Sequence, residues 1–142
     1  MKKTALVLGL LFITMASCKE AKKSMEKQDL NNLGGKYVVT ELPGVTIGER
    51  APHLLFNQQE GKVNGHTGCN AFFGKYAVGG EGLQFEDIAS TEMACEPAIM
   101  EIEGKFLKAL WESGKASLNN GYLTLYSKDD NELLLTAKHQ KD

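Results

Sequence analysis

The chain has 142 residues, enough for one domain rather than two, and 42% of them are hydrophobic. That composition is typical of a globular protein rather than a disordered one. Removing residues 1–17 takes away Lys2 and Lys3 and no acid, which leaves 14 basic against 18 acidic residues, a formal net charge of −4. Nucleic-acid binding needs a basic footprint, so this balance argues against a nucleic-acid partner.

The first 18 residues have the pattern of an export signal that ends at a cysteine. Two lysines at positions 2 and 3 precede an apolar stretch from Ala5 to Met15. This stretch is about half the ~20 residues of a membrane-spanning helix, which suits a signal peptide. Residues 15–18, Met-Ala-Ser-Cys, resemble the lipobox cleaved by the lipoprotein signal peptidase. We therefore expect a signal peptide at 1–17 and lipidation of Cys18; the alternative is an ordinary secretory signal with an incidental cysteine.

Residues 18–33 are mostly polar and are expected to form a tether between the lipidated cysteine and a folded domain. About 15 extended residues span at most ~50 Å. Each buried methylene of an acyl chain adds ~0.8 kcal/mol, and more than one chain is needed for a lasting anchor. The expected location is the cell envelope, as an outer-membrane lipoprotein on the periplasmic or the surface-facing side, and the expected partner is the membrane.

From Gly34 onward the hydrophobic pattern is mostly of period two, which is typical of β-strands. Asn120-Gly121 is a strong hairpin signal between two of these segments. The sequence predicts an α+β fold: one small domain at 34–138, with a curved, mainly antiparallel sheet of some seven or eight short strands wrapped around one amphipathic helix. Residues 139–142 are expected to be a tail, with His139 as a solvated surface residue.

The helix is predicted to begin at Pro97 and to stop near Gly114. Apolar residues recur there at the three-to-four spacing of a core-facing stripe. The stripe consists of Ile99, Ile102, Phe106, Ala109 and Leu110. The acids of the helix, Glu103 among them, are expected on a solvated face. Gly104 costs up to ~1 kcal/mol in a helix interior relative to alanine, so it is interpreted as a point of close packing on the sheet.

Two motifs make the domain recognisable. Residues 68–76, Gly-Cys-Asn-Ala-Phe-Phe-Gly-Lys-Tyr, resemble the GCNxFxGxY motif of the META domain, also called the HslJ-like heat-shock protein family. Residues 91–95, Thr-Glu-Met-Ala-Cys, resemble the family's TxMAC motif. The motif residues are Gly68, Cys69, Asn70, Phe72, Gly74, Tyr76, Thr91, Met93, Ala94 and Cys95.

The resemblance covers about 34–138 and departs from the family at Tyr37, where members often have tryptophan. It implies an envelope lipoprotein, as many members are, and a loose link to stress resistance. It supplies no reaction and no catalytic residue.

Cys69 and Cys95 form an even pair once Cys18 is consumed by lipid, and disulfides persist outside the cytoplasm, so a structural disulfide is predicted. Two alternatives remain open. One is a reactive Cys69 thiol, with His66 lowering its pKa, Asn70 as a third group and Cys95 as the resolving partner. The other is a zinc site built from both cysteines, His66 and His53.

The other motif residues have structural interpretations. Gly68 and Gly74 are typical of bulges or close backbone approaches, Asn70 of a turn, Thr91 of a cap and Met93 of a core filler. The leading hypothesis is a non-enzymatic binding module for an envelope protein or a small ligand, with no metal and no cofactor. The alternatives are a thiol-dependent redox enzyme, a metal-binding module, and a structural module that docks through an exposed sheet edge.

Overall fold

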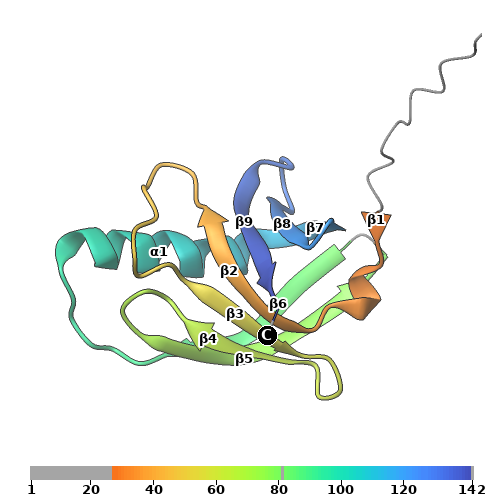
Figure 1. The fold of residues 1–142 in the computed structure, drawn as a ribbon, viewed down its shortest axis with the longest axis horizontal. Helices are drawn as coiled ribbons and strands as arrows, with labels where there is room; N and C mark the ends of the chain where they lie inside the picture. The colour runs from red at the N-terminus through yellow and green to blue at the C-terminus, as the bar shows by residue number, and fades with distance from the viewer. Residues whose placement is uncertain (1–26, 81, 142) are drawn as a thin grey trace, which may run out of the picture.

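The computed structural model describes residues 27–80 and 82–141. They form nine strands, one α-helix and one short 3-10 helix (Figure 1). The elements are β1 (Lys27–Gln28), η1 (Leu30–Asn32), β2 (Gly35–Glu41), β3 (His53–Asn57), β4 (Lys62–His66), β5 (Ala71–Gly79), β6 (Gly82–Ser90), α1 (Pro97–Glu112), β7 (Ser113–Asn119), β8 (Tyr122–Ser127) and β9 (Leu133–Gln140).

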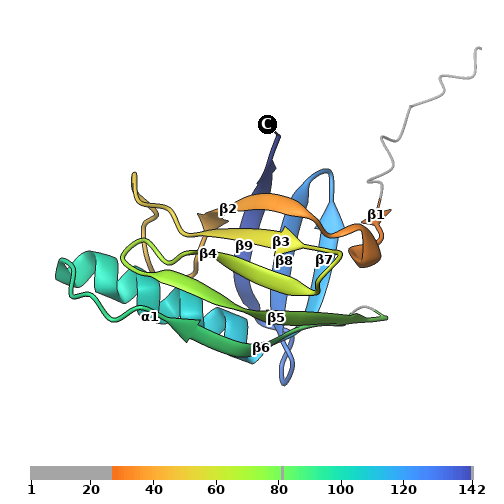
Figure 2. The ribbon, with the colours of Figure 1, turned by 90° about the horizontal axis from the view of Figure 1, so that it is seen from below.

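All nine strands belong to one antiparallel sheet in the order β1-β7-β8-β9-β2-β3-β4-β5-β6. The sheet curls until β6 approaches β7, where the Ser113 hydroxyl donates to the carbonyl oxygen of Leu83 at 2.8 Å. The sheet is therefore a nearly closed barrel of eight strands, and the two-residue β1 extends it at β7 (Figure 2). The predicted fold class is confirmed.

The inner face of the barrel is apolar because side chains alternate along each strand. In β2, Tyr37 and Val39 are buried while Val38 and Thr40 face outward, as the period-two pattern predicts. Aromatic rings cross the interior: Phe56 contacts Tyr76 edge to face, with centroids 5.0 Å apart. One continuous core thus joins the strands of both halves of the chain.

Helix α1 begins at the predicted Pro97 and packs against the sheet through its predicted apolar stripe. The Phe106 ring meets the Phe72 ring with centroids 5.4 Å apart. The helix ends at Glu112, and the chain passes directly into β7, so Gly114 lies in a strand rather than at a helix stop. No helix of the described residues is long and apolar enough to cross a membrane.

The folded domain extends further at both ends than the predicted 34–138. Leu30 and Leu33, assigned to the tether 18–33, are buried because η1 turns them into the core. His139, assigned to the tail 139–142, lies in β9 and is half-buried because its ring packs beside Tyr37, with centroids 4.9 Å apart. The first 26 residues, including the predicted signal peptide and Cys18, lie outside the described residues.

Gly104 does not pack closely on the sheet, so that interpretation was wrong. It is exposed in the middle of α1, and a Cβ atom built on it would meet no atom within 4 Å. The residue therefore weakens the helix without a visible packing reason.

We expect Gly104→Ala to stabilise the domain by about 0.5–1 kcal/mol, because alanine loses less backbone entropy in a helix. Equilibrium unfolding in urea measures the change. Gly121→Ala is the matched control, since Gly121 has a φ of +78° in the β7–β8 turn and alanine should destabilise there. A loss of stability in Gly104→Ala would show that this glycine has a structural role.

Candidate functional site

The side-chain amide of Asn70 joins three separate segments of the chain. Its Nδ2 donates to both carboxylate oxygens of Glu103, at 2.9 and 3.0 Å, and to the carbonyl oxygen of Met93 at 3.1 Å. Its Oδ1 accepts from the Thr91 hydroxyl at 2.9 Å and from the Met93 backbone N–H at 2.8 Å. Both ends of the amide are thus used, and the loop before β5, the segment 91–95 and α1 are fixed to one another.

Glu103 is the buried acceptor at the centre of this cluster. Its carboxylate accepts hydrogen bonds from the Thr67 hydroxyl, the Asn70 backbone N–H and the Asn70 side chain, and the residue is only 7% exposed. Within the part of the chain that the structure describes, no basic side chain forms a salt bridge with it. The prediction that the helix acids lie on a solvated face is wrong for Glu103.

The spacing of Glu103 in the sequence indicates that its side chain lies on the buried face of α1. It lies four residues after Ile99 and three before Phe106, within the apolar stripe of α1. A carboxylate in such a stripe must find polar partners in the core, because burying an unpaired charge is very unfavourable. The sequence pattern alone did not indicate which residues those partners are.

The two TxMAC residues next to Asn70 contribute in different ways. The Thr91 hydroxyl donates to Asn70, whereas Met93 bonds through its backbone and is 59% exposed as a residue. The prediction of Met93 as core filler is therefore wrong: its peptide groups, which any residue carries, make the contact. The expectation that the Asn70 side chain bonds local backbone in a turn is also wrong: it bonds the backbone of Met93, 23 residues further along the chain, and the helix residue Glu103.

A disulfide reinforces the same junction. The structure joins Cys69 to Cys95, with Cα atoms 6.0 Å apart, as the sequence predicted. Gly68 sits just before it with a φ of +101°, and a Cβ there would be 2.9 Å from the Arg50 carbonyl oxygen, so only glycine fits without strain. The disulfide ties the β4–β5 loop to the segment that leads into α1.

The remaining motif residues are structural as well. Phe72 packs on the helix, the Tyr76 hydroxyl donates to the Leu33 carbonyl oxygen at 3.3 Å, and Gly74 lies at a register shift between β5 and β6. Ala94 is exposed. Among the described residues, every buried side-chain nitrogen and oxygen atom has a hydrogen-bond partner. The motif therefore stabilises the scaffold, and its polar atoms are already engaged.

The two histidines of the alternative sites lie beside the disulfide. His53 and His66 are cross-strand partners with rings stacked 6.4 Å apart, and they line a hollow of about 390 Å³. Burial, then Lys36 and His66, lowers the pKa of His53 below its usual range. Nδ1 of His66 accepts the Gly68 N–H at 3.1 Å. Because both sulfurs are bonded to each other, neither is available as a thiolate nucleophile or a zinc ligand in this form of the protein.

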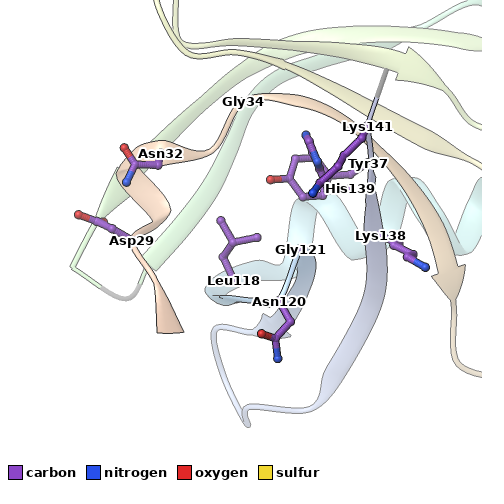
Figure 3. Close-up of a pocket in the computed structure, with 10 residues that line it drawn as sticks. All are labelled: Asp29, Asn32, Gly34, Tyr37, Leu118, Asn120, Gly121, Lys138, His139 and Lys141. Carbon is purple, nitrogen blue, oxygen red and sulfur yellow. The ribbon is translucent and has the colours of Figure 1, made fainter. Parts of the chain in front are cut away.

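A larger hollow lies at the mouth of the barrel, between η1, the β7–β8 turn and the end of β9 (Figure 3). We call it the mouth cleft; its volume is about 850 Å³. Its walls are formed by Asp29, Asn32, Gly34, Tyr37, Leu118, Asn120, Gly121, Lys138, His139 and Lys141. None of these residues was predicted as a site residue, because they come from both ends of the domain and share no motif.

The chemistry of the mouth cleft centres on Tyr37 and His139. The ring of Tyr37 is buried against Phe56, and its hydroxyl points into the cleft (Figure 3). Burial, and then Tyr76, raises the pKa of Tyr37, so the hydroxyl is neutral and able to donate at physiological pH. The His139 ring lies against Gly35, where a Cβ atom would be 2.9 Å from Nε2. These side chains offer donors and an apolar floor, which are the features of a small-ligand site.

Fold and motif together define a single-domain α+β protein: a nearly closed antiparallel barrel with one packed helix and a disulfide beside it. Residues 28–140 match the family model of the META domain, and the chain belongs to the META domain family. A search of curated proteins finds no significant match.

Three solved structures resemble this chain in fold. One is an NMR structure of a protein from Burkholderia xenovorans, with a TM-score of 0.62 and 22% identity, over 80% of this chain and 88% of that one. A second NMR structure has a TM-score of 0.57 and 26% identity, over 73% and 87%. A crystal structure of a DUF4847 family protein from Bacteroides vulgatus has a TM-score of 0.57 and 13% identity, over 77% and 94%.

We expect Glu103→Gln to destabilise the domain by about 2 kcal/mol or more, because a side-chain NH₂ would then face the donors of Asn70 and Thr67. Urea unfolding measures the loss. Glu101→Gln, an exposed change on the same helix, should alter stability by less than about 0.5 kcal/mol. Equal effects of the two substitutions would contradict the assignment of Glu103 as a buried acceptor.

Replacing Cys69 and Cys95 by alanine should destabilise the domain by about 3 kcal/mol, because the disulfide closes a loop with a sequence separation of 26. Unfolding curves of the double variant give the loss. A chain that lacks Cys18 but retains Cys69 and Cys95 should gain two hydrogens on reduction, as measured by its intact mass with and without reductant. Rapid alkylation of either thiol without reductant would restore the reactive-thiol hypothesis.

Proposed function

We propose that this protein is a membrane-anchored, non-catalytic binding module of the cell envelope, and that the mouth cleft is its ligand site. The proposal rests on a difference between two sets of polar groups. The buried polar side chains of the motifs are hydrogen-bonded within the scaffold, whereas the mouth cleft presents polar groups to solvent.

The arrangement around Cys69 supports a binding role over the thiol-enzyme alternative. Cys69 is 2% exposed and bonded to Cys95, and the neighbouring Asn70 is held by Glu103 and Met93. A nucleophile needs a free thiolate with a base in reach. The thiol alternative would require reduction of this disulfide before any reaction.

Anchoring rests on the export signal and the cysteine at position 18. A short polar tether would hold the domain at the membrane surface and would keep the cleft available to ligands there. The proposal includes a role under envelope stress, which the family resemblance suggests.

Cell fractionation tests the anchor. The wild-type chain should be in the membrane fraction and should carry acyl chains by mass spectrometry, while Cys18→Ser should be released to the soluble fraction of the envelope. Wild-type protein found soluble and unacylated would contradict the proposal.

Native mass spectrometry of the chain purified from membranes tests the cleft. A bound species should be retained by the wild type and lost in Asn32→Trp, where an indole on the exposed cleft wall fills the space. Gln84→Trp, an exposed change on β6, is the matched control and should retain the species. Retention in both variants would place the ligand elsewhere.

A further inference from the structure

The mouth cleft lies at the end of the domain where the tether enters. Strand β1 pairs with Asn119 and Leu118 of β7, and Leu118 forms part of the cleft. In both overall views, β1 and η1 are at the opposite end of the molecule from the start of α1 (Figures 1 and 2). The chain thus enters the fold beside the cleft.

Only a short chain separates Cys18 from this end. The nine residue steps from Cys18 to Lys27 span at most about 30 Å when fully extended. If Cys18 is acylated, the rim of the cleft cannot lie much further than this from the bilayer surface. A ligand that is part of the membrane would therefore be present at high local concentration.

The charge of this end is opposite to that of the rest of the chain. The tether segment 19–27 contains four lysines and two glutamates, although the chain without residues 1–17 has a formal net charge of −4. Lys138 and Lys141 are part of the cleft wall, although the Lys138 side chain points away from the other cleft residues, with Nζ 5.7 Å from the Tyr122 ring centroid (Figure 3). Asp29 is the one acid among the described residues that line the cleft, and it already accepts from the Asn31 backbone and side chain. Basic groups at this position attract anionic lipid.

The interior of the cleft suits a headgroup rather than a bare surface contact. The Tyr37 hydroxyl and the imidazole of His139 are hydrogen-bonding groups on its walls, and Leu118 is an apolar contact (Figure 3). The volume of about 850 Å³ falls in the range of small-molecule sites.

We infer that the mouth cleft binds the phosphate-bearing headgroup of an anionic phospholipid in the membrane to which Cys18 is anchored. This inference rests on the proposed function and names the ligand of its site. Bound in this way, the domain would be oriented on the bilayer by two contacts, the acyl anchor and the headgroup.

Vesicle co-sedimentation tests the inference with the chain 18–142 carrying Cys18→Ser, so that acylation cannot contribute. Binding to phosphatidylcholine vesicles should strengthen when phosphatidylglycerol is added. Lys138→Gln with Lys141→Gln should weaken that binding about tenfold or more, since each basic group near an anionic surface contributes severalfold. Lys115→Gln with Lys128→Gln makes the same charge change near the start of β7 and just after the end of β8, away from the β7–β8 turn at the cleft. This control pair should weaken binding by about twofold or less.

Asn32→Trp separates insertion into the cleft from general charge attraction, because it fills the cleft without changing charge. It should reduce binding to the anionic vesicles severalfold, while Gln84→Trp should not. Equal losses in the two lysine pairs, or full binding by Asn32→Trp, would overturn the inference.

A titration with inorganic phosphate, followed by NMR of His139, distinguishes a lipid from a free anion. Weak or absent binding of free phosphate beside strong vesicle binding supports the lipid, whereas tight binding of free phosphate would overturn the lipid assignment. If the vesicle experiment shows no binding while the wild-type chain in cells is acylated and in the membrane fraction, only this inference is rejected. A soluble, unacylated chain in cells would reject the proposed function instead.

Discussion

The buried carboxylate of Glu103 is the constraint on which the arrangement of the helix and sheet depends. A carboxylate taken out of water must be matched by hydrogen-bond donors, and the donors here come from Thr67 and Asn70 at the β4–β5 loop. Asn70 in turn is hydrogen-bonded to Met93 and Thr91. The position of α1 on the sheet therefore depends on both this loop and the segment before the helix. The Cys69–Cys95 disulfide crosslinks the same junction covalently.

This constraint explains why the recognisable motifs of the chain are separate from the proposed ligand site. Asn70 is the third group of the reactive-thiol alternative, yet its polar atoms, like the Thr91 hydroxyl, are used within the scaffold. The barrel they help to close leaves its mouth open at the other end of the strands, where Tyr37 and His139 lie. The scaffold and the proposed ligand site therefore use different residues, so the mouth can vary in chemistry while the fold is retained.

Local patterns predicted most of the fold. The alternation in β2 placed Tyr37 and Val39 on one face, which the structure buries. The three-to-four spacing identified the buried face of α1, and the two cysteines were predicted to pair. The errors at Glu103 and His139 concern residues whose environment is set by distant parts of the chain. Glu103 is buried because the β4–β5 loop supplies donors, and His139 is half-buried because β9 pairs with β2 over Tyr37. The mouth cleft was missed for the same reason, since its walls meet only after the barrel has closed.

Asn70 and Glu103 act as one unit that fixes the helix on the sheet. A double-mutant cycle with Asn70→Ala, Glu103→Ala and the combined variant, measured by urea unfolding, tests this coupling. We expect the double variant to be about 1.5–3 kcal/mol more stable than the sum of the single losses predicts, because each single change leaves the other partner buried and unpaired. Losses that add within about 0.5 kcal/mol would show that the two side chains act independently and would contradict the claim.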